Sequence, residues 1–227
     1  MSEGAVGRAD TVHAPARFGF VYLASQSPRR RQLLEQIGVR HEMLLADADE
    51  DVESLEAHRA GEAPVVYVGR VTRAKLDAAR ERLARRGLAQ APVLCADTTV
   101  AIGRTILGKP ADAAEARDRW QRMAGRSGVL HTGQALFDVR DGVVASRDIA
   151  VASTVVYFAS PTPQELEAYL ATGEPMAVAG AFTLDGLGSP FVRRVEGDPA
   201  AVVGLSLTVL RTQLSKRGLA ITDLWRR

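Results

Sequence analysis

One segment near the N-terminus constrains the fold most, because it changes from strand-type to helix-type sequence within a few residues. Phe18–Ala24 is a short apolar run with aromatic and β-branched side chains, which predicts a buried strand. Ser27-Pro28 follows as an N-cap residue with proline at the first helical position, and predicts the start of a helix. Gly38 stands where this helix should end. A strand that leads directly into a helix indicates an α/β protein.

The rest of the chain continues this mixture and adds hairpins. The patterns predict a helix from Pro64 to Gly87, a strand at Val93–Ala96, a hairpin around Gly103-Arg104, a helix beginning at Asp112, a hairpin around Arg140–Gly142, a helix beginning at Thr162 and a last helix through Val203, Leu207, Leu210 and Leu214. Hairpins favour a mixed sheet over a purely parallel one. We expect the fold to occupy residues 18–227 and residues 1–17, which lack an apolar period, to form a disordered lead.

Composition excludes several classes of protein. Cys95 is the single cysteine of the 227 residues, which excludes an intramolecular disulfide and a cysteine zinc cage and predicts a reducing, cytoplasmic location. No run of about 18 apolar residues is present, so we expect no membrane span. The net charge of +2 is too small to indicate a nucleic-acid partner.

The segment Leu23–Arg31 has the composition of an anion-binding site. A strand runs through Ser25 and Ser27 into the N-terminus of a helix whose first turn carries Arg29 and Arg30. Helix N-termini present N–H groups and partial positive charge, and guanidinium groups match phosphate oxygens. A plain Ser-Pro cap with solvated arginines is an equally good interpretation of the pattern. The chain has no Gly-Lys-Ser/Thr loop, so a Walker-type ATPase is disfavoured.

Two further residues are candidates for phosphate chemistry. Asp97 directly follows the apolar strand Val93–Ala96, at the end of a strand where α/β sheets form their ligand crevice. Its carboxylate would activate water or hold a divalent cation, and the alternative is a helix or turn cap. Lys109 lies between Gly108 and Pro110, where a fixed ammonium suits phosphate, although a surface turn lysine is the commoner outcome.

We expect two charged segments to have no role in binding a metal or a nucleic acid. Asp47, Asp49 and Asp51 begin like a calcium loop, but valine and histidine then stand where glycine and glutamate are needed, so we expect a solvated acidic loop. The helix from Pro64 to Gly87 should bury Tyr67, Val71, Ala74 and Ala78 and direct most of its arginines, Arg82 included, elsewhere. Its end, with Arg82, Arg85 and Arg86, favours a solvated face over a nucleic-acid contact, because acidic residues interrupt it.

Taken in order, these segments resemble the Maf family of nucleoside triphosphate pyrophosphatases over about residues 18–217. The motifs that carry the resemblance are Leu23-Ala24-Ser25-x-Ser27-Pro28-Arg29-Arg30 with Leu33-Leu34, Glu42 after Gly38, Tyr67-x-x-Arg70-x-x-Arg73-x-Lys75, Ala96-Asp97-Thr98, Gly108-Lys109-Pro110, Gly173-Glu174-Pro175, Ala179-Gly180-Ala181-Phe182, Gly186-Leu187-Gly188, Glu196-Gly197-Asp198 and Val203-Gly204-Leu205.

The resemblance implies a mixed α/β fold similar to that of inosine triphosphatase, with two lobes around a nucleotide cleft and commonly a homodimer. It implies that a nucleoside triphosphate and water give the monophosphate and pyrophosphate. It assigns Asp97 as the proton acceptor, and Asp97 and Glu42 as carboxylates for Mg²⁺ or Mn²⁺. The residues it implies for holding the triphosphate are Ser25, Ser27, Arg30, Lys75 and Lys109.

Three residues bear on the branch of the family. Arg29 and Thr98 resemble the dTTP/UTP branch, while Asp185 stands where that branch typically has glutamine. A carboxylate only accepts hydrogen bonds, so we expect Asp185 to contact the substrate and to loosen the preference for pyrimidines. A 7-methyl-GTP pyrophosphatase and a nucleotide-occupied regulator of septum formation are the alternatives, and a nucleic-acid-binding module is a third.

Overall fold

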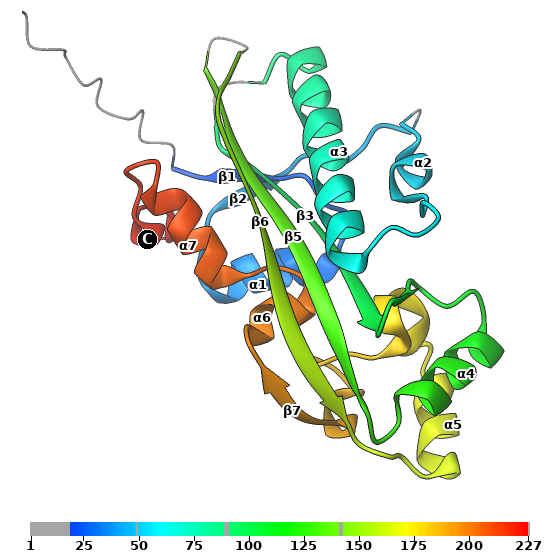
Figure 1. The fold of residues 1–227 in the computed structure, drawn as a ribbon. Coiled ribbons are helices and arrows are strands. Elements are labelled where there is room, and N and C mark those ends of the chain that lie inside the picture. The colour runs from blue at the N-terminus through cyan, green and yellow to red at the C-terminus, as the bar shows by residue number, and fades with distance from the viewer. Residues whose placement is uncertain (1–18, 49, 89–90, 141–142, 227) are drawn as a thin grey trace, which may run out of the picture.

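The computed structural model describes residues 19–48, 50–88, 91–140 and 143–226, whose strands form one mixed sheet (Figure 1). The strand order is β2-β1-β3-β5-β6-β7, with β4 paired to β3. β1 is parallel to β2 and to β3, and the other pairs are antiparallel. The strands are β1 Val21–Leu23, β2 His41–Met43, β3 Val93–Ile102, β4 Thr105–Leu107, β5 Ser127–Arg140, β6 Val143–Phe158 and β7 Val192–Glu196. The expected mixed α/β fold is confirmed.

Helices cover both faces of this sheet (Figure 1). Side chains alternate along the strands, so that Cys95 and Ala135 pack toward α3 while Leu94 and Leu136 pack toward α1 and α7. In the described part of the chain, no helix has the length and apolar character needed to cross a bilayer. The helices are α1 Pro28–Gln36, α2 Val52–Glu56, α3 Pro64–Arg85, α4 Ala113–Met123, α5 Pro163–Ala171, α6 Pro199–Val203, α7 Leu207–Ser215, and the short 3₁₀ segments η1 Glu174–Ala177, η2 Ala179–Ala181, η3 Ser189–Phe191 and η4 Ile221–Leu224.

A second core lies where β5 begins and β6 ends, beside α4 and α5 (Figure 1). It is built around Trp120 of α4, which packs edge-on against Phe158 and Tyr169 and donates from its indole N–H to the carbonyl of Ala181 at 2.8 Å. The β5–β6 hairpin runs through both cores and joins them. The sheet with α1 and α7 on one face and α3 on the other forms the first lobe, and the core around Trp120 forms the second lobe.

The predicted helix starts and the predicted end of α1 are confirmed, because each depends on residues within one turn of the chain. α1 begins at Pro28 after Ser27, and Gly38 follows its end with φ of 70°. The Asp112 side chain accepts from the backbone N–H of Glu115 at 2.8 Å, and Thr162 opens α5 with a reciprocal capping box. Both hairpins form, although residues 141–142 of the second turn lie outside the described residues.

The expected last helix is wrong in one respect, because the structure divides it into α6 and α7. Gly204 ends α6 with φ of 142°, a backbone conformation that favours glycine. Each helix has its own cap: Asp198 accepts from the N–H of Ala200 at 2.9 Å, and Ser206 accepts from the N–H of Val209 at 3.0 Å. The break turns the carbonyl of Gly204 toward α1, where it has a partner described below.

The acidic and basic segments that the sequence left solvated are partners of each other. Arg82 is buried, donates to the carbonyl of Leu44 at 2.9 Å and pairs with Glu50. Arg85 and Arg86 pair with Asp47. The three arginines that a nucleic-acid contact would have used are therefore paired with carboxylates of the same chain. Arg82 is buried on a face of α3 where the sequence predicts exposure. Ala74 and Ala78, expected inside, are only half-buried.

Replacing Arg82 with methionine should lower the free energy of unfolding by about 3 kcal/mol, since it removes a buried guanidinium with one carbonyl and one carboxylate partner. Arg85→Met is the matched control, because the Arg85 side chain is 48% exposed and its pairs with Asp47 and Glu50 are screened by water. We expect the control to change stability by less than about 1 kcal/mol. Urea unfolding of both variants measures the difference, and equal losses would contradict the assignment of Arg82 to the core.

Candidate active site

The candidate site lies at an uncovered stretch of the β3 edge. β1 pairs with β3 at Val93 and Leu94, and β4 pairs with it again from Val100, so neither strand covers residues 96–99 on this side. A cavity of about 540 Å³ opens at this gap and extends between the two lobes. Its volume lies within the range of small-molecule sites, roughly 300–1,000 Å³.

The cavity has a charged part and an apolar part. Its charged lining residues are Arg29, Arg30, Lys75, Arg82, Lys109, Glu50, Glu56 and Asp97, and its serines are Ser25 and Ser27. The apolar part comes largely from the second lobe and from α6, and includes Leu130, Val178, Phe182, Leu184, Val202 and Val203. This division suits a ligand with one strongly anionic end and one flat or apolar end.

The first turn of α1 faces the cavity without a side-chain cap. Ser27 occupies the N-cap position, but its hydroxyl makes no capping hydrogen bond, and its N–H donates to the hydroxyl of Ser25 at 3.2 Å. Arg31, on the outer side, is half exposed and pairs with Glu35. The plain Ser-Pro cap is therefore not what the structure shows, and the uncapped turn leaves N–H groups for an anion.

Arg30 is held by neutral acceptors alone. Its Nε donates to the carbonyl of Gly204 at 2.8 Å, and its two terminal nitrogens donate to the hydroxyls of Ser25 at 3.0 Å and Thr98 at 3.1 Å. Thr98 lies 3.0 Å from the hydroxyl of Thr132, which donates to a backbone carbonyl of α6. Thr98 therefore holds Arg30 in place, a contact that the sequence did not indicate.

The charge on Arg30 has no carboxylate partner among the described residues. The side chain is 9% exposed, and burial lowers the pKa of its guanidinium although Asp97 and Glu56 act in the opposite direction. An arginine remains protonated even so. A buried cation that lacks a counterion is costly, and an anionic ligand in the cavity would supply the missing charge.

Asp97 and Glu56 share the ammonium of Lys75. Lys75 Nζ lies 2.7 Å from Asp97 Oδ1 and 2.5 Å from Glu56 Oε1. Asp97 is 8% exposed, so its carboxylate lies well inside the cavity. Asp97 lies within β3 and not after its end, because the strand continues to Ile102 where the sequence predicted an end at Ala96. The structure pairs Lys75, which the resemblance assigns to the triphosphate, with Asp97 and with Glu56, which no local motif distinguishes from the other acids near it.

Two other proton-bearing groups near Asp97 are poor bases. Burial, together with the charges of Asp97 and Glu56, raises the pKa of the Tyr67 phenol to about 12. Burial also raises the pKa of the Cys95 thiol to about 12. Both groups stay protonated at neutral pH, which leaves the carboxylates as the bases of this region.

Lys109 stands on a turn that the second lobe holds in place. Arg119 of α4 donates to the carbonyls of Gly108 and Lys109, and the N–H of Gly180 donates to Gly108 at 3.0 Å. The Lys109 side chain lines the cavity and has no carboxylate partner within the described ranges. The turn is therefore held in place beside the cavity, and Lys109 itself is exposed, as the surface-turn interpretation expects.

Arg29 and Asp185 meet at the rim. Arg29 lines the cavity, and its guanidinium donates to Asp185 Oδ1 at 2.7 Å. The two side chains are 21% and 31% exposed, so the pair is partly open to water. This contact joins α1 to the loop after η2, and Asp185 itself, expected to contact the substrate, is not among the cavity-lining residues.

Glu42 is not part of this arrangement. It lies exposed on β2, opposite Tyr22 in the strand register, and is not among the cavity-lining residues. The carboxylates that do line the cavity are Glu50, Glu56 and Asp97, and Glu50 is engaged by Arg82 and Arg85. The structure therefore does not place Glu42 beside Asp97 at the cavity, and Glu56 is the carboxylate that shares Lys75 with Asp97 there.

The fold and this cavity define an α/β protein with a site for a polyanion that carries an apolar group. The chain matches the Maf-like protein family over residues 20–217, and it belongs to that family. It is 49% identical to a dTTP/UTP pyrophosphatase of Burkholderia pseudomallei over 86% of this chain and 92% of the relative. It is 46% identical to a nucleoside triphosphate pyrophosphatase of Salinispora tropica, over 90% of this chain and 87% of the relative.

One solved structure extends the comparison. The nucleoside-triphosphatase / dITP/XTP pyrophosphatase of Mycobacterium abscessus superposes with a TM-score of 0.37 at 12% identity, over 87% of this chain and 93% of that chain. The family assignment rests on the sequence matches alone.

Replacing Arg30 with methionine should weaken binding of inorganic tripolyphosphate by at least about tenfold, because it removes charge-assisted hydrogen bonds to the anion. The unfolding free energy should fall by at most about 2 kcal/mol, since relief of a buried charge offsets the lost hydrogen bonds. Arg31→Met, on the exposed side of the same turn, is the control. Calorimetric titration measures the affinities, and equal losses in both variants would contradict the role of Arg30.

Proposed function

We propose that this protein hydrolyses nucleoside triphosphates to nucleoside monophosphates and pyrophosphate. The observation that carries the proposal is the buried Arg30 guanidinium, which lacks a carboxylate partner among the described residues and lies in the same cavity as the Asp97 carboxylate. Arg30, Lys109 and the uncapped turn of α1 form a grip for the phosphate chain. The apolar wall suits a base and sugar. The activities named for the relatives support the same reaction.

In the reaction, the oxygen of a water molecule forms a bond to the α-phosphorus, and the bond from that phosphorus to the oxygen bridging to the β-phosphorus breaks. Asp97 accepts the proton of the attacking water. The bridging oxygen leaves with the pyrophosphate, whose growing negative charge is stabilised by the cations of the cavity. Lys75 keeps the Asp97 carboxylate in position before the water arrives.

A divalent cation fits the donors that line the cavity. Within the described residues no three His, Cys, Asp or Glu side chains converge as a metal cluster. Mg²⁺ usually binds through one or two carboxylates together with substrate phosphates and water, and Asp97 and Glu56 provide such a pair. Bound there, the ion would neutralise phosphate charge and polarise the phosphoryl oxygens. We infer that Asp97 and Glu56, in place of Glu42, would hold Mg²⁺ or Mn²⁺.

For the base, we propose dTTP and UTP as the preferred substrates. Arg29 and Thr98 support this choice through the family resemblance, and the relative of B. pseudomallei is named for these substrates. A preference for 7-methyl-GTP is the alternative within the family. The other alternative is a regulatory protein of septum formation that binds a nucleotide without hydrolysing it. A measurement of turnover distinguishes this class of protein from an enzyme. A homodimer and a cytoplasmic location stay predictions.

The purified protein should release one pyrophosphate per monophosphate from dTTP or UTP, and Asp97→Asn should lower kcat by at least about 10²-fold, because it removes the proton acceptor. Nucleotide affinity should change little, since the amide keeps the size of the side chain and Arg30 is untouched. Product analysis and equilibrium binding measure the two effects. Release of orthophosphate in place of pyrophosphate would contradict the reaction, and a fully active variant would contradict the role of Asp97.

Removal of divalent cations should stop the hydrolysis, and Mg²⁺ or Mn²⁺ should restore it. The reason is that two carboxylates without histidine or cysteine partners in the described chain hold such ions weakly. Turnover in chelator, followed by titration with each ion, is the measurement. Glu56→Gln should raise the Mg²⁺ concentration needed for half-maximal rate, whereas Glu42→Gln should leave it unchanged. Full activity in excess chelator would contradict metal dependence.

Asp185→Gln should sharpen the preference for dTTP and UTP over other triphosphates. The substitution removes the ion pair with Arg29 and introduces an amide that both donates and accepts. Each 1.4 kcal/mol regained corresponds to roughly tenfold in the ratio of kcat/KM values. Glu167→Gln, which breaks the exposed pair with Arg117 on the second lobe, is the control. Unchanged ratios would show that residue 185 does not act on the base.

A further inference from the structure

Glu174 is the centre of a hydrogen-bond cluster behind the apolar wall of the cavity. Its carboxylate accepts from the hydroxyls of Thr183 and Tyr169 and from the backbone N–H groups of Leu187 at 3.1 Å and Gly188 at 3.2 Å. Burial works against its ionisation, but these hydrogen bonds outweigh burial and hold the pKa of Glu174 below its usual range. In the described part of the chain, no lysine or arginine pairs with it. All the hydrogen bonds that the Glu174 carboxylate accepts therefore come from Tyr169 and from the loop of residues 183–188.

The loop of residues 183–188 folds closely around this carboxylate. A Cβ added at Gly186 would lie 2.5 Å from Glu174 Oε2, and one at Gly188 would lie 2.7 Å from the Thr183 hydroxyl. Both glycines are therefore required by the closeness of the loop to the carboxylate. The loop returns to Thr183, whose hydroxyl also accepts from the N–H of Gly188 at 3.0 Å.

The same loop supplies two parts of the site. Thr183 and Leu184 line the cavity next to Phe182, on its apolar wall. Asp185 then forms the ion pair with Arg29 at the rim. Glu174 touches neither the cavity nor Arg29 in the contacts described, so any effect it has on substrate passes through the loop.

We propose that Glu174 is a positioning residue that fixes the 183–188 loop, and through it the base-facing wall and the Asp185 partner of Arg29. The proposal rests on the proposed function of the cavity. Glu174 then sets how tightly and how selectively the nucleoside part is bound, while the phosphate grip at Arg30 and the chemistry at Asp97 do not depend on it.

Glu174→Gln tests this assignment with a side chain of equal size. An amide replaces one accepting oxygen with a donor, which cannot serve the N–H and O–H donors that converge there. We expect KM for dTTP and UTP to rise about tenfold, kcat to change less than about threefold, and the preference among bases to flatten. The inhibition constant of inorganic tripolyphosphate should stay within about twofold, because that ligand has no base.

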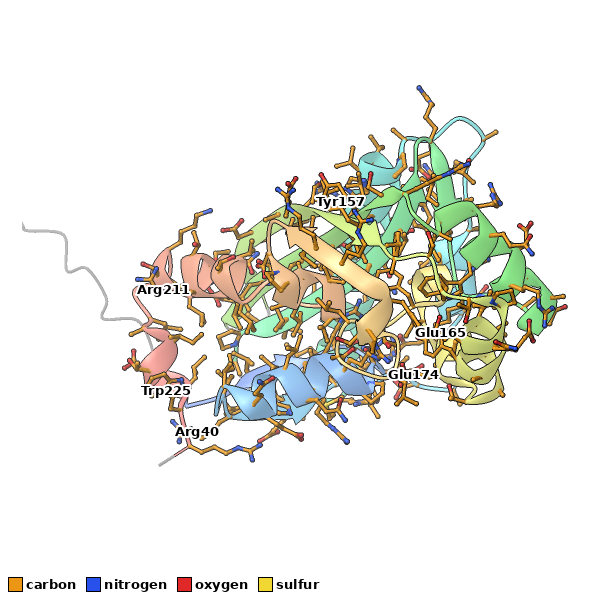
Figure 2. All side chains as sticks on the ribbon, turned by 90° about the horizontal axis from the view of Figure 1, so that it is seen from below. Arg40, Tyr157, Glu165, Glu174, Arg211 and Trp225 are labelled. Atoms are coloured by element: carbon orange, nitrogen blue, oxygen red, sulfur yellow. The ribbon has the colours of Figure 1, made fainter. Side chains whose placement is uncertain are left out.

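Glu165→Gln is the matched control, since it weakens the capping box of the neighbouring α5 without touching the loop; both glutamates are labelled in Figure 2. Hydrogen exchange of residues 183–188 provides a readout that does not need activity. We expect faster exchange there in Glu174→Gln and unchanged exchange in Glu165→Gln.

The outcomes separate the two proposals. A wild-type protein that hydrolyses no triphosphate would overturn the proposed function, while faster loop exchange in Glu174→Gln alone would still support the anchoring of the loop. Unchanged exchange and an unchanged KM, or an equal loss of tripolyphosphate binding, would overturn the role of Glu174. If Glu174→Gln does not fold, Glu174→Asp retains the charge but is one methylene shorter, and it should show faster loop exchange with an intermediate KM; exchange as slow as in the wild type would overturn the proposal.

Discussion

The guanidinium of Arg30 is held out of water by three neutral acceptors, and much of the surrounding architecture supplies them. The break between α6 and α7 presents the carbonyl of Gly204, the turn after β1 presents the Ser25 hydroxyl, and β3 presents Thr98. Hydrogen bonds to neutral groups orient the cation without neutralising it. The protein therefore stores a fixed positive charge that an anionic ligand can use, at some expense in stability.

Arg30 and Lys109 differ from the other cations near the cavity, because those cations are paired with carboxylates. Arg82 and Arg85 are engaged by Glu50, Arg29 by Asp185, and Lys75 by two carboxylates. A ligand that enters the cavity thus meets two cations without carboxylate partners in the described chain. The number of arginines and lysines near the cavity is therefore larger than the number of positive charges that a substrate can use. Which of them carry a carboxylate partner decides where positive charge is available.

The sequence was informative where one turn of chain decides the outcome, and misleading where distant partners do. Thr162 with its glutamate, and Asp112 with Glu115, make contacts three residues apart, which a local pattern reveals. Arg82 meets its carbonyl partner 38 residues away, and Lys75 meets Glu56 19 residues away. No spacing rule predicts such contacts, so the burial of Arg82 and the pairing of Lys75 with Glu56 became visible only in the structure. Glu42 was assigned by motif alone and lies elsewhere.

The position of Asp97 relative to Arg30 follows from the geometry of a single strand. Neighbouring residues of a β-strand point to opposite faces, so Asp97 meets Lys75 on the α3 side while Thr98 meets Arg30 on the α1 side. β3 is fixed along its other edge by continuous pairing with β5, and its near edge is left open for the substrate. One peptide unit therefore sets the spacing between the Asp97 carboxylate and Thr98, which supports the buried cation. Movement of the second lobe would alter the apolar wall and the rim, but it would leave this spacing unchanged, because both groups belong to the same rigid strand.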